Sequence, residues 1–235
     1  MKEKIYKGTS KTLYQAEEDY ALIMSFEDSL RISQTETIEF AGKGVINNSI
    51  SSTMMQKLEM IGINNHFIEK INMRRQLVQF VDVYPIQTHV STIACGRYVT
   101  EFGMENGFVF ETPMIDFRIK NKDLNYPIIN ESQIINFGWM NKHELKAIKN
   151  QALRVHDFLV GFFAGVSIRM VDIKLEFGRV FNGEDIILML VDEISPDTCR
   201  LWDMETNEKL CYEIAHQDHN LLLPAYQQVL QRIVV

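Results

Sequence analysis

Several features that would define common classes of protein are absent from this sequence. Only three of its 235 residues are cysteines, at positions 95, 199 and 211, and no two of them form a CxxC pair. That usage indicates a reducing, cytoplasmic environment and argues against disulfides and structural zinc. The sequence also has no HExxH motif, and His216 and His219 lack the further ligands that a metal site needs. A thiol or histidine metal centre is therefore not indicated.

Long apolar runs and an excess of basic residues are absent as well. No run approaches the roughly 18 apolar residues that a membrane helix needs, and the charged N-terminus lacks the apolar core of a signal peptide. Thirty-one acidic residues outnumber 24 basic ones, for a net charge of −7. That balance disfavours non-specific binding of nucleic acid. We expect a globular protein of the cytoplasm, without membrane or nucleic-acid partners. The net charge leaves the binding of anionic small molecules open, because local basic groups can bind them.

The length of the chain suits one large domain or two small lobes. The first third combines short alternating segments with one helix, whose apolar residues recur from Ile46 to Ile61 and which Gly62 ends. Residues 27–39 lack periodicity and predict a loop, and Pro85 is expected to end a strand. The strands of this part are expected at residues 5–8, 12–15, 20–26, 66–71 and 76–83.

The rest of the chain carries longer helices. Asn141 and Glu144 form a capping-box pattern at the start of the longest predicted helix, residues 141–165. Strands are expected at 89–94 and 114–120, a short helix or turn from Asn130, and a final helix over 224–235. We predict an α+β fold with two lobes: residues 1–82 with a mostly antiparallel sheet and one helix, and residues 83–235 with an antiparallel sheet and packed helices. Residues 81–85 would form the hinge.

A charged strand near the centre of the second lobe concentrates the chemistry. Asp172, Lys174 and Glu176 alternate with apolar residues, so they share one face of a strand. An apolar run over 186–191 follows the Asn182-Gly183 turn signal and ends in acidic residues. Carboxylates brought together in this way can bind a divalent cation. From the pattern alone, a solvated charged face is the slightly better interpretation, because charged pairs are common on strands.

The pairing register decides whether Asp192 joins Glu176. A two-residue turn at Asn182-Gly183 would pair Asp192 with Ile173, on the face opposite Glu176. A three-residue loop, 182–184, would pair it with Lys174 on the same face. A shared metal site therefore predicts the longer loop or a bulge.

Two sequence blocks resemble a known family. They are VDIKLEFG at residues 171–178 and DEISPDTCRLWD at 192–203. Together they resemble the SAICAR synthetase (phosphoribosylaminoimidazole-succinocarboxamide synthase) family of purine biosynthesis, and the similarity extends over nearly the whole chain. Supporting matches lie at residues 8–14, 42–48, 120–121, 127–131 and 205–209.

The resemblance implies an ATP-dependent ligase with its ATP cleft between the two lobes. ATP would phosphorylate the carboxylate of carboxyaminoimidazole ribonucleotide, and the amine of L-aspartate would displace phosphate to give SAICAR and ADP. An acyl phosphate splits one difficult step into two easier ones, and Mg²⁺ would neutralise charge on the phosphates. Relatives also imply a homo-oligomer. The alternatives are a ligase or kinase-like phosphotransferase that acts on another carboxylate, and a non-catalytic nucleotide-binding scaffold.

The resemblance also implies roles for particular residues at the nucleotide. Glu176 and Asp192 would bind magnesium. Gly8 and Lys11 of the first hairpin would contact the phosphates, and the backbone from Val81 to Val83 would hold the adenine.

Further residues would serve the ribotide and the chemistry. Lys120, Asp172 and Lys174 are the expected catalytic residues, with Asp172 a candidate base for the aspartate amine. Substrate-binding roles are implied for Ser91, Gly96, Arg97, Asp197 and Arg200, with Arg200 on the ribotide phosphate.

The chain departs from the family pattern in four places. Its N-terminal motif reads GTSK at 8–11 where the family commonly has GKAK, and Gln79 or Phe80 replaces a basic residue before the hinge. The family's RNxAAGS appears as STIACGR at 91–97. Ser91 therefore stands at the family's arginine position, and Arg97 stands at its serine position. We hypothesise that Arg97 supplies the missing guanidinium. The basic run DKDRFR appears as CYEIAH at 211–216, so anionic substrates are expected to bind more weakly than in relatives.

Overall fold

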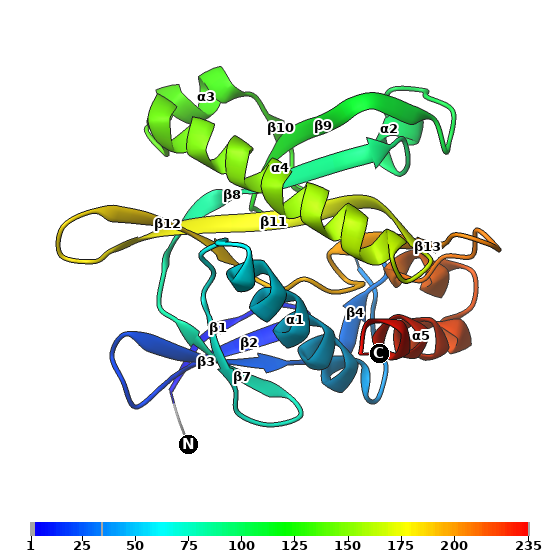
Figure 1. Ribbon diagram of the computed structural model, residues 1–235, viewed down its shortest axis with the longest axis horizontal. Helices are drawn as coiled ribbons and strands as arrows, with labels where there is room; N and C mark the ends of the chain where they lie inside the picture. Colours follow the sequence, from blue (N-terminus) through cyan, green and yellow to red (C-terminus); the bar gives the residue numbers. More distant parts are fainter. Residues whose placement is uncertain (1–2, 34, 235) are drawn as a thin grey trace.

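The computed structural model describes residues 3–33 and 35–234, and it contains two large antiparallel sheets with helices packed against them (Figure 1). The five-stranded sheet has the order β1-β2-β3-β7-β6. The second sheet has the order β10-β9-β8-β11-β12, with β13 also paired to β11. The predicted α+β class is confirmed. The boundary between residues 82 and 83 stays a prediction, because one core extends across it.

The elements follow one another along the chain. The strands are β1 (Lys4–Lys7), β2 (Lys11–Gln15), β3 (Ala21–Phe26), β4 (Ser29–Arg31), β5 (Thr37–Glu39), β6 (Phe67–Lys70), β7 (Arg75–Gln79), β8 (Asp82–Ile93), β9 (Val109–Ile119), β10 (Ile128–Ile129), β11 (Ile168–Phe181), β12 (Ile186–Val191) and β13 (Cys199–Asp203). The helices are α1 (Lys43–Met60), α2 (Arg97–Thr100), α3 (Glu131–Asn136), α4 (Lys142–Ala164) and α5 (Leu222–Ile233), with 3₁₀ turns at Tyr212–His216 and His219–Leu221.

The helix α1 connects the two halves of the molecule. Its residues Ile50 and Met54 are fully buried and belong to the same cluster as Ile173 and Leu175 of β11. Gly62 follows the helix with φ of 77°, a conformation that glycine adopts without strain, so the predicted stop is confirmed. Figure 1 shows α1 above the five-stranded sheet and α4 across the second sheet.

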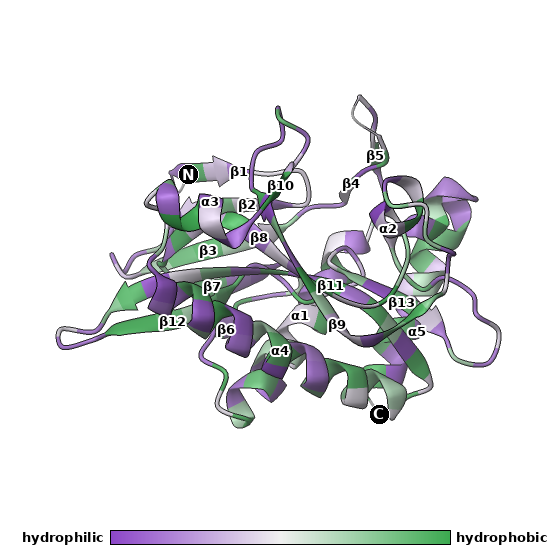
Figure 2. Cartoon of the chain, turned by 90° about the horizontal axis from the view of Figure 1, so that it is seen from above, coloured by the Kyte–Doolittle hydropathy of each residue, from purple (hydrophilic) through white to green (hydrophobic). Residues whose placement is uncertain are grey.

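The central strand of the second sheet is β11. It pairs with β8, β12 and β13, and its apolar face, with Ile173, Leu175 and Phe177, is buried in the core. The helix α4 packs on this sheet; Figure 2 shows hydrophobic and hydrophilic residues alternating along it. Asn141 and Glu144 form the predicted capping box. The opposite face of β11 is thereby left for charged residues.

Two predictions about local structure are wrong. Residues 27–39 are not a loop: β4 and β5 form a small hairpin, whose three-residue strands are too short to show a period. Pro85 does not end a strand but lies within β8. It lies in a bulge of β8, where residues 84–86 oppose Phe177 alone of β11, so the ladder is interrupted and no N–H donor is needed.

The remaining general predictions concern cysteines and membranes. All three cysteines are free and buried. Across residues 3–33 and 35–234, no helix is both long and apolar enough to cross a membrane. The last residue of the predicted final helix, at position 235, lies outside the described residues; α5 ends at Ile233.

Candidate active site

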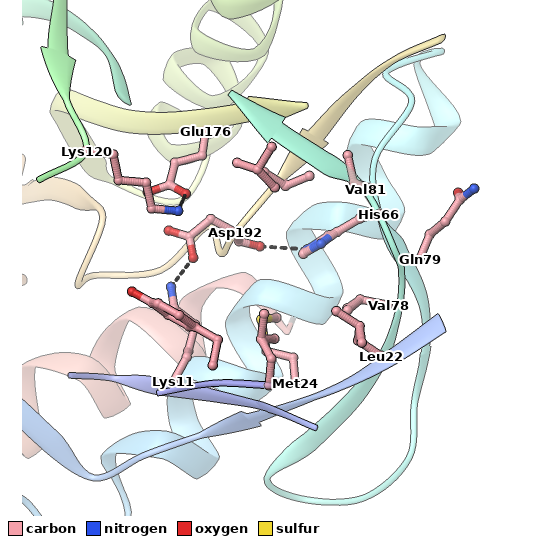
Figure 3. Close-up of a pocket in the computed structure, with 14 residues that line it drawn as sticks. Lys11, Leu22, Met24, His66, Val78, Gln79, Val81, Lys120, Glu176 and Asp192 are labelled. Atoms are coloured by element: carbon pink, nitrogen blue, oxygen red, sulfur yellow. Dashed lines mark hydrogen bonds and ion pairs between the residues drawn. The ribbon is translucent and has the colours of Figure 1, made fainter. Parts of the chain in front are cut away.

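A pocket lies between the five-stranded sheet and the ends of β11 and β12 (Figure 3). Its volume of about 260 Å³ is close to the lower end of the range for small-molecule sites. Apolar side chains from both sheets line one part of it, including Leu22, Met24 and Val78. Charged side chains line the other part: Lys11, Lys120, Glu176 and Asp192. One part suits a flat apolar ring and the other suits charged groups.

Two lysines neutralise the acidic residues of this pocket. Lys11 of β2 forms ion pairs with Asp192 and, at 2.8 Å, with Glu193. Lys120, just after β9, pairs with Glu176. Burial opposes the charge on Lys11, yet the two carboxylates raise its pKa overall. Burial and the neighbouring Asp192 raise the pKa of Glu176.

The observed pairing register of β11 and β12 shows how Asp192 reaches the same site as Glu176. Phe181 pairs with Ile186, which leaves a four-residue loop, residues 182–185. The two-residue turn is therefore absent. The three-residue loop, residues 182–184, is also wrong, because the observed loop is one residue longer. Regular pairing at this register would place Asp192 opposite Leu175. Asp192 instead follows the end of β12 with φ of 69°, so strand alternation no longer applies and its carboxylate lines the same pocket as that of Glu176.

These two carboxylates fit a magnesium–phosphate group. In the part of the chain that the structure describes, no three His, Cys, Asp or Glu side chains form a metal cluster. Mg²⁺ in nucleotide sites needs only one or two protein carboxylates, because phosphate oxygens and water complete its coordination. Glu176 and Asp192 meet that requirement.

His66 supports Asp192 and was not identified from the sequence. Its Nε2 donates to the backbone carbonyl of Asp192 at 2.9 Å, as Figure 3 shows. Burial lowers the pKa of His66 to about 4. His66 therefore stays neutral and fixes the backbone that presents the Asp192 carboxylate.

The hinge reaches the pocket through Val81 and Val83. It crosses β11 at Gly178, where an added Cβ would lie 2.5 Å from Val81 Cγ1 and 2.6 Å from the Asp82 carbonyl oxygen. Glycine is required at this position because the two backbones approach so closely. Gly8 closes the turn before Lys11, and its N–H donates to the Lys11 carbonyl at 2.8 Å.

A second pocket adjoins the first. Gln87 lines it and donates from Nε2 to Glu176 at 3.0 Å, so Glu176 lies beside both pockets. Lys174 and Asp197 also line it. Asp197 does not extend freely into the space: the buried Lys43 donates to it at 2.5 Å and the Tyr226 hydroxyl also binds it. The sequence indicated the 42–48 segment but not this contact.

Arg200 lies at the end of this region. Its guanidinium pairs with Asp172 and, at 2.8 Å, with Glu213. Gly96, with φ of 52°, packs against it: a Cβ there would lie 2.6 Å from Arg200 Nη2. Asp172, Gly96 and Arg200, predicted as separate site residues, are therefore in one cluster.

Arg97 and Ser91 differ from one another in their surroundings. Ser91 is buried in β8. Arg97 is bound by both carboxylate oxygens of Glu101 and donates to the Tyr126 carbonyl at 3.4 Å. The hypothesis that Arg97 replaces the family arginine stays a prediction. Alternation along residues 114–120 could have identified Arg118, which lines the second pocket two residues before Lys120.

The fold and the paired pockets define a nucleotide-dependent enzyme: an apolar slot beside lysines and paired carboxylates suits a nucleoside triphosphate and a second, anionic substrate. The model of the SAICAR synthetase family matches residues 4–233. The chain belongs to the SAICAR synthetase family, whose activity is an ATP-dependent ligase reaction of purine biosynthesis.

Individual relatives agree with this assignment. The phosphoribosylaminoimidazole-succinocarboxamide synthase of Rickettsia massiliae is 58% identical over 233 residues, 99% of each chain. The crystal structure of the Ehrlichia chaffeensis synthase is 36% identical with a TM-score of 0.95 and covers 98% of both chains. A SAICAR synthetase solved in complex with ADP is 34% identical with a TM-score of 0.92, covering 97% of this chain and 96% of its own.

Proposed function

We propose that this chain joins L-aspartate to the carboxylate of carboxyaminoimidazole ribonucleotide through an acyl phosphate, and so forms SAICAR, ADP and phosphate. The observation that carries this proposal is the position of Glu176. Its carboxylate contacts Lys120 in the first pocket and Gln87 at the edge of the second. A phosphoryl group can therefore pass between ligands in the two pockets without leaving the protein.

The first pocket would bind ATP. The adenine would lie among Leu22, Met24 and Val78, with its edge on the backbone from Val81 to Val83. The phosphates would extend toward Lys11 and Lys120, whose charges compensate their negative charge. Glu176 and Asp192 would hold Mg²⁺, which neutralises phosphate oxygens when bound.

The chain's residues would then orient two successive displacements. A carboxylate oxygen of the ribotide attacks the γ-phosphorus, and ADP leaves. The aspartate amine next attacks the acyl carbon, phosphate leaves, and the amine loses a proton. Asp172 is a candidate acceptor for that proton: one of its oxygens faces Arg200, and the other, Oδ1, has no hydrogen-bond partner among residues 3–33 and 35–234. Lys120 would position the reacting groups.

ADP release with the ribotide, measured with and without L-aspartate, tests this function. We expect turnover that requires both substrates and Mg²⁺. Glu176→Gln and Asp192→Asn should each lower kcat by about 100-fold or more, because each removes charge from the metal–phosphate site. Asp185→Asn, at the exposed tip of the same hairpin, is the matched control and should keep full activity.

Other outcomes would identify the alternatives. Turnover with a different acid or amine would indicate a ligase of other specificity, and nucleotide binding without turnover would indicate a scaffold. We also propose a cytoplasmic location, which the free cysteines support, and a homo-oligomer, which sedimentation of the purified protein would test.

A further inference from the structure

Polar residues form a regular array on the face of the second sheet that borders the second pocket. Strand pairing places Arg118 beside Gln87, and Gln87 beside Glu176. The next row carries Asp116, His89 and Lys174. Directly paired residues on one face have Cβ atoms about 4.5–5.5 Å apart. His89 and Lys174 are such direct partners, and Arg118 lies diagonal to His89, about 7–8 Å away. All three line the pocket.

These three basic side chains have no anionic partner in the part of the chain that the structure describes. Among residues 3–33 and 35–234, Arg118 Nε and His89 Nε2 are buried and have no hydrogen-bond partner, and His89 is only 5% exposed. Lys174 packs over the Tyr212 ring at 4.6 Å. Burying a donor without a partner is unfavourable, because the donor loses its hydrogen bonds to water. Such a cluster is typical of a site built for a ligand.

The groups that act on His89 are cations, whereas Asp116 and Asp172 partly offset the effect of Arg97 and Arg200 on Arg118. Burial, and then Arg97, lower the pKa of Arg118. Burial and four surrounding cations, Arg118 first, lower the pKa of His89 well below its ordinary value. Asp116, the nearest acid on this face, receives the Tyr98 hydroxyl. Asp116 forms no ion pair with Arg118 among the described residues, so an incoming anion can bind this guanidinium.

The other two arginines of the region are already compensated. Arg200 is held between Asp172 and Glu213, and Arg97 is held by Glu101. Binding a phosphate through either of them requires their present carboxylates to share or release the guanidinium. Arg118 has no such competitor.

We propose that Arg118, assisted by His89 and Lys174, binds the phosphate of the ribotide substrate. This inference rests on the proposed function and names the phosphate-binding residues of this chain. A phosphate dianion fits because it offers several acceptor oxygens to a guanidinium, a ring N–H and an ammonium at once. The hydroxyls of Thr9, Ser10 and Ser29 lie across the same pocket and would complete its hydrogen bonds from the N-terminal side.

Binding of a stable ribotide tests the proposal apart from catalysis. The probe is the ribotide that carries a carboxamide in place of the carboxylate, compared by calorimetry with its riboside, which lacks the phosphate. Arg118→Gln should weaken ribotide binding by about 10- to 100-fold, the range of a charge-assisted hydrogen bond, and leave riboside binding within about two-fold. Arg118→Lys, which keeps the charge, should recover part of the loss.

Matched variants make the result specific. Arg97→Gln should weaken ribotide binding far less than Arg118→Gln, and Arg154→Gln on the exposed side of α4 should have no effect. Equal losses for ribotide and riboside, or a loss confined to Arg97→Gln, would overturn the proposal. So would an unchanged ribotide KM in Arg118→Gln with a raised L-aspartate KM. Failure of the wild-type protein to release ADP would overturn the proposed function instead.

Discussion

At the scale of single residues, the pKa values of the acidic groups around the first pocket shift in opposite directions. Burial raises the pKa of both Glu176 and Glu193. Asp192 is partly buried, which also opposes its charge, yet Lys11 and Lys120 lower its pKa. Lys11 therefore keeps Asp192 charged in the ligand-free protein. A nucleotide that draws Lys11 toward its phosphates would leave this carboxylate available to a cation.

His66 gives this protein a pH-dependent stability. Its pKa is about 4 in the folded protein and 6.5 unfolded, so the unfolded chain binds the proton more readily. The stabilisation is complete above about pH 6.5 and is lost as the pH falls toward 4, on the order of 3 kcal/mol for this residue. In His66→Gln, whose amide can still donate to Asp192, the free energy of unfolding should change less between pH 7 and 4.5.

Urea unfolding at the two pH values measures this difference. His216→Gln, which replaces an exposed histidine, controls for removal of a histidine as such. If wild type and His66→Gln lose the same free energy between the two pH values, the buried imidazole is not the group responsible.

Residue roles were predictable where a strand period or a sequence block placed them. Alternation put Asp172, Lys174 and Glu176 on one face, which the cross-strand partners Ser91, His89 and Gln87 share. Alternation could not identify Glu193 or Lys43. Glu193 contacts Lys11 and Lys43 contacts Asp197, and each contact joins residues more than 150 positions apart. Such long-range pairs depend on tertiary packing, which no local pattern encodes.

At the scale of elements, the hinge and β11 depend on each other. Gly178→Ala should displace the hinge, because its Cβ would meet the Val81 side chain and the Asp82 carbonyl oxygen. We expect the KM for ATP to rise about ten-fold and the free energy of unfolding to fall by about 1–3 kcal/mol, while the KM for the ribotide stays within about two-fold.

Steady-state kinetics with each substrate varied in turn measures this effect. Gly161→Ala in α4 is the matched control, since nothing lies within 4 Å of its added Cβ; it should stabilise the helix by up to about 1 kcal/mol. An ATP KM that does not move in Gly178→Ala would show that the hinge backbone does not position the nucleotide.

Element prediction succeeded for long periodic segments and failed for short ones. The capped helix α4 and the helix α1 were predictable because many residues repeat the same period. The β4–β5 hairpin has only three residues in each strand, and the position of Pro85 inside β8 depends on a bulge that exists only when β8 pairs with β11. The four-residue loop after Phe181 likewise follows from the final pairing and not from the Asn182-Gly183 signal.

At the scale of the whole molecule, the two sheets are joined by more than the hinge. The α1 side chains share one core with β11 and α4, and the His66 N–H donates to the Leu190 carbonyl of β12 at 2.9 Å. The ion pairs of Lys11 with Asp192 and Glu193 also cross between the sheets. The presence of two separate sheets would suggest two folding units, whereas the core that they share favours a single unit.

We therefore expect a single cooperative unfolding transition, with calorimetric and van't Hoff enthalpies in agreement. Mg²⁺ and ADP should move that one transition to higher temperature. At a ligand concentration 100 times its Kd, binding adds about 2.7 kcal/mol to the free energy of unfolding. Asp192→Asn should reduce the shift in temperature, because the protein would keep only one of the two carboxylates that bind Mg²⁺. Differential scanning calorimetry distinguishes the cases: two transitions, of which ADP moves only one, would mean that residues 1–82 and 83–235 unfold independently despite their common core.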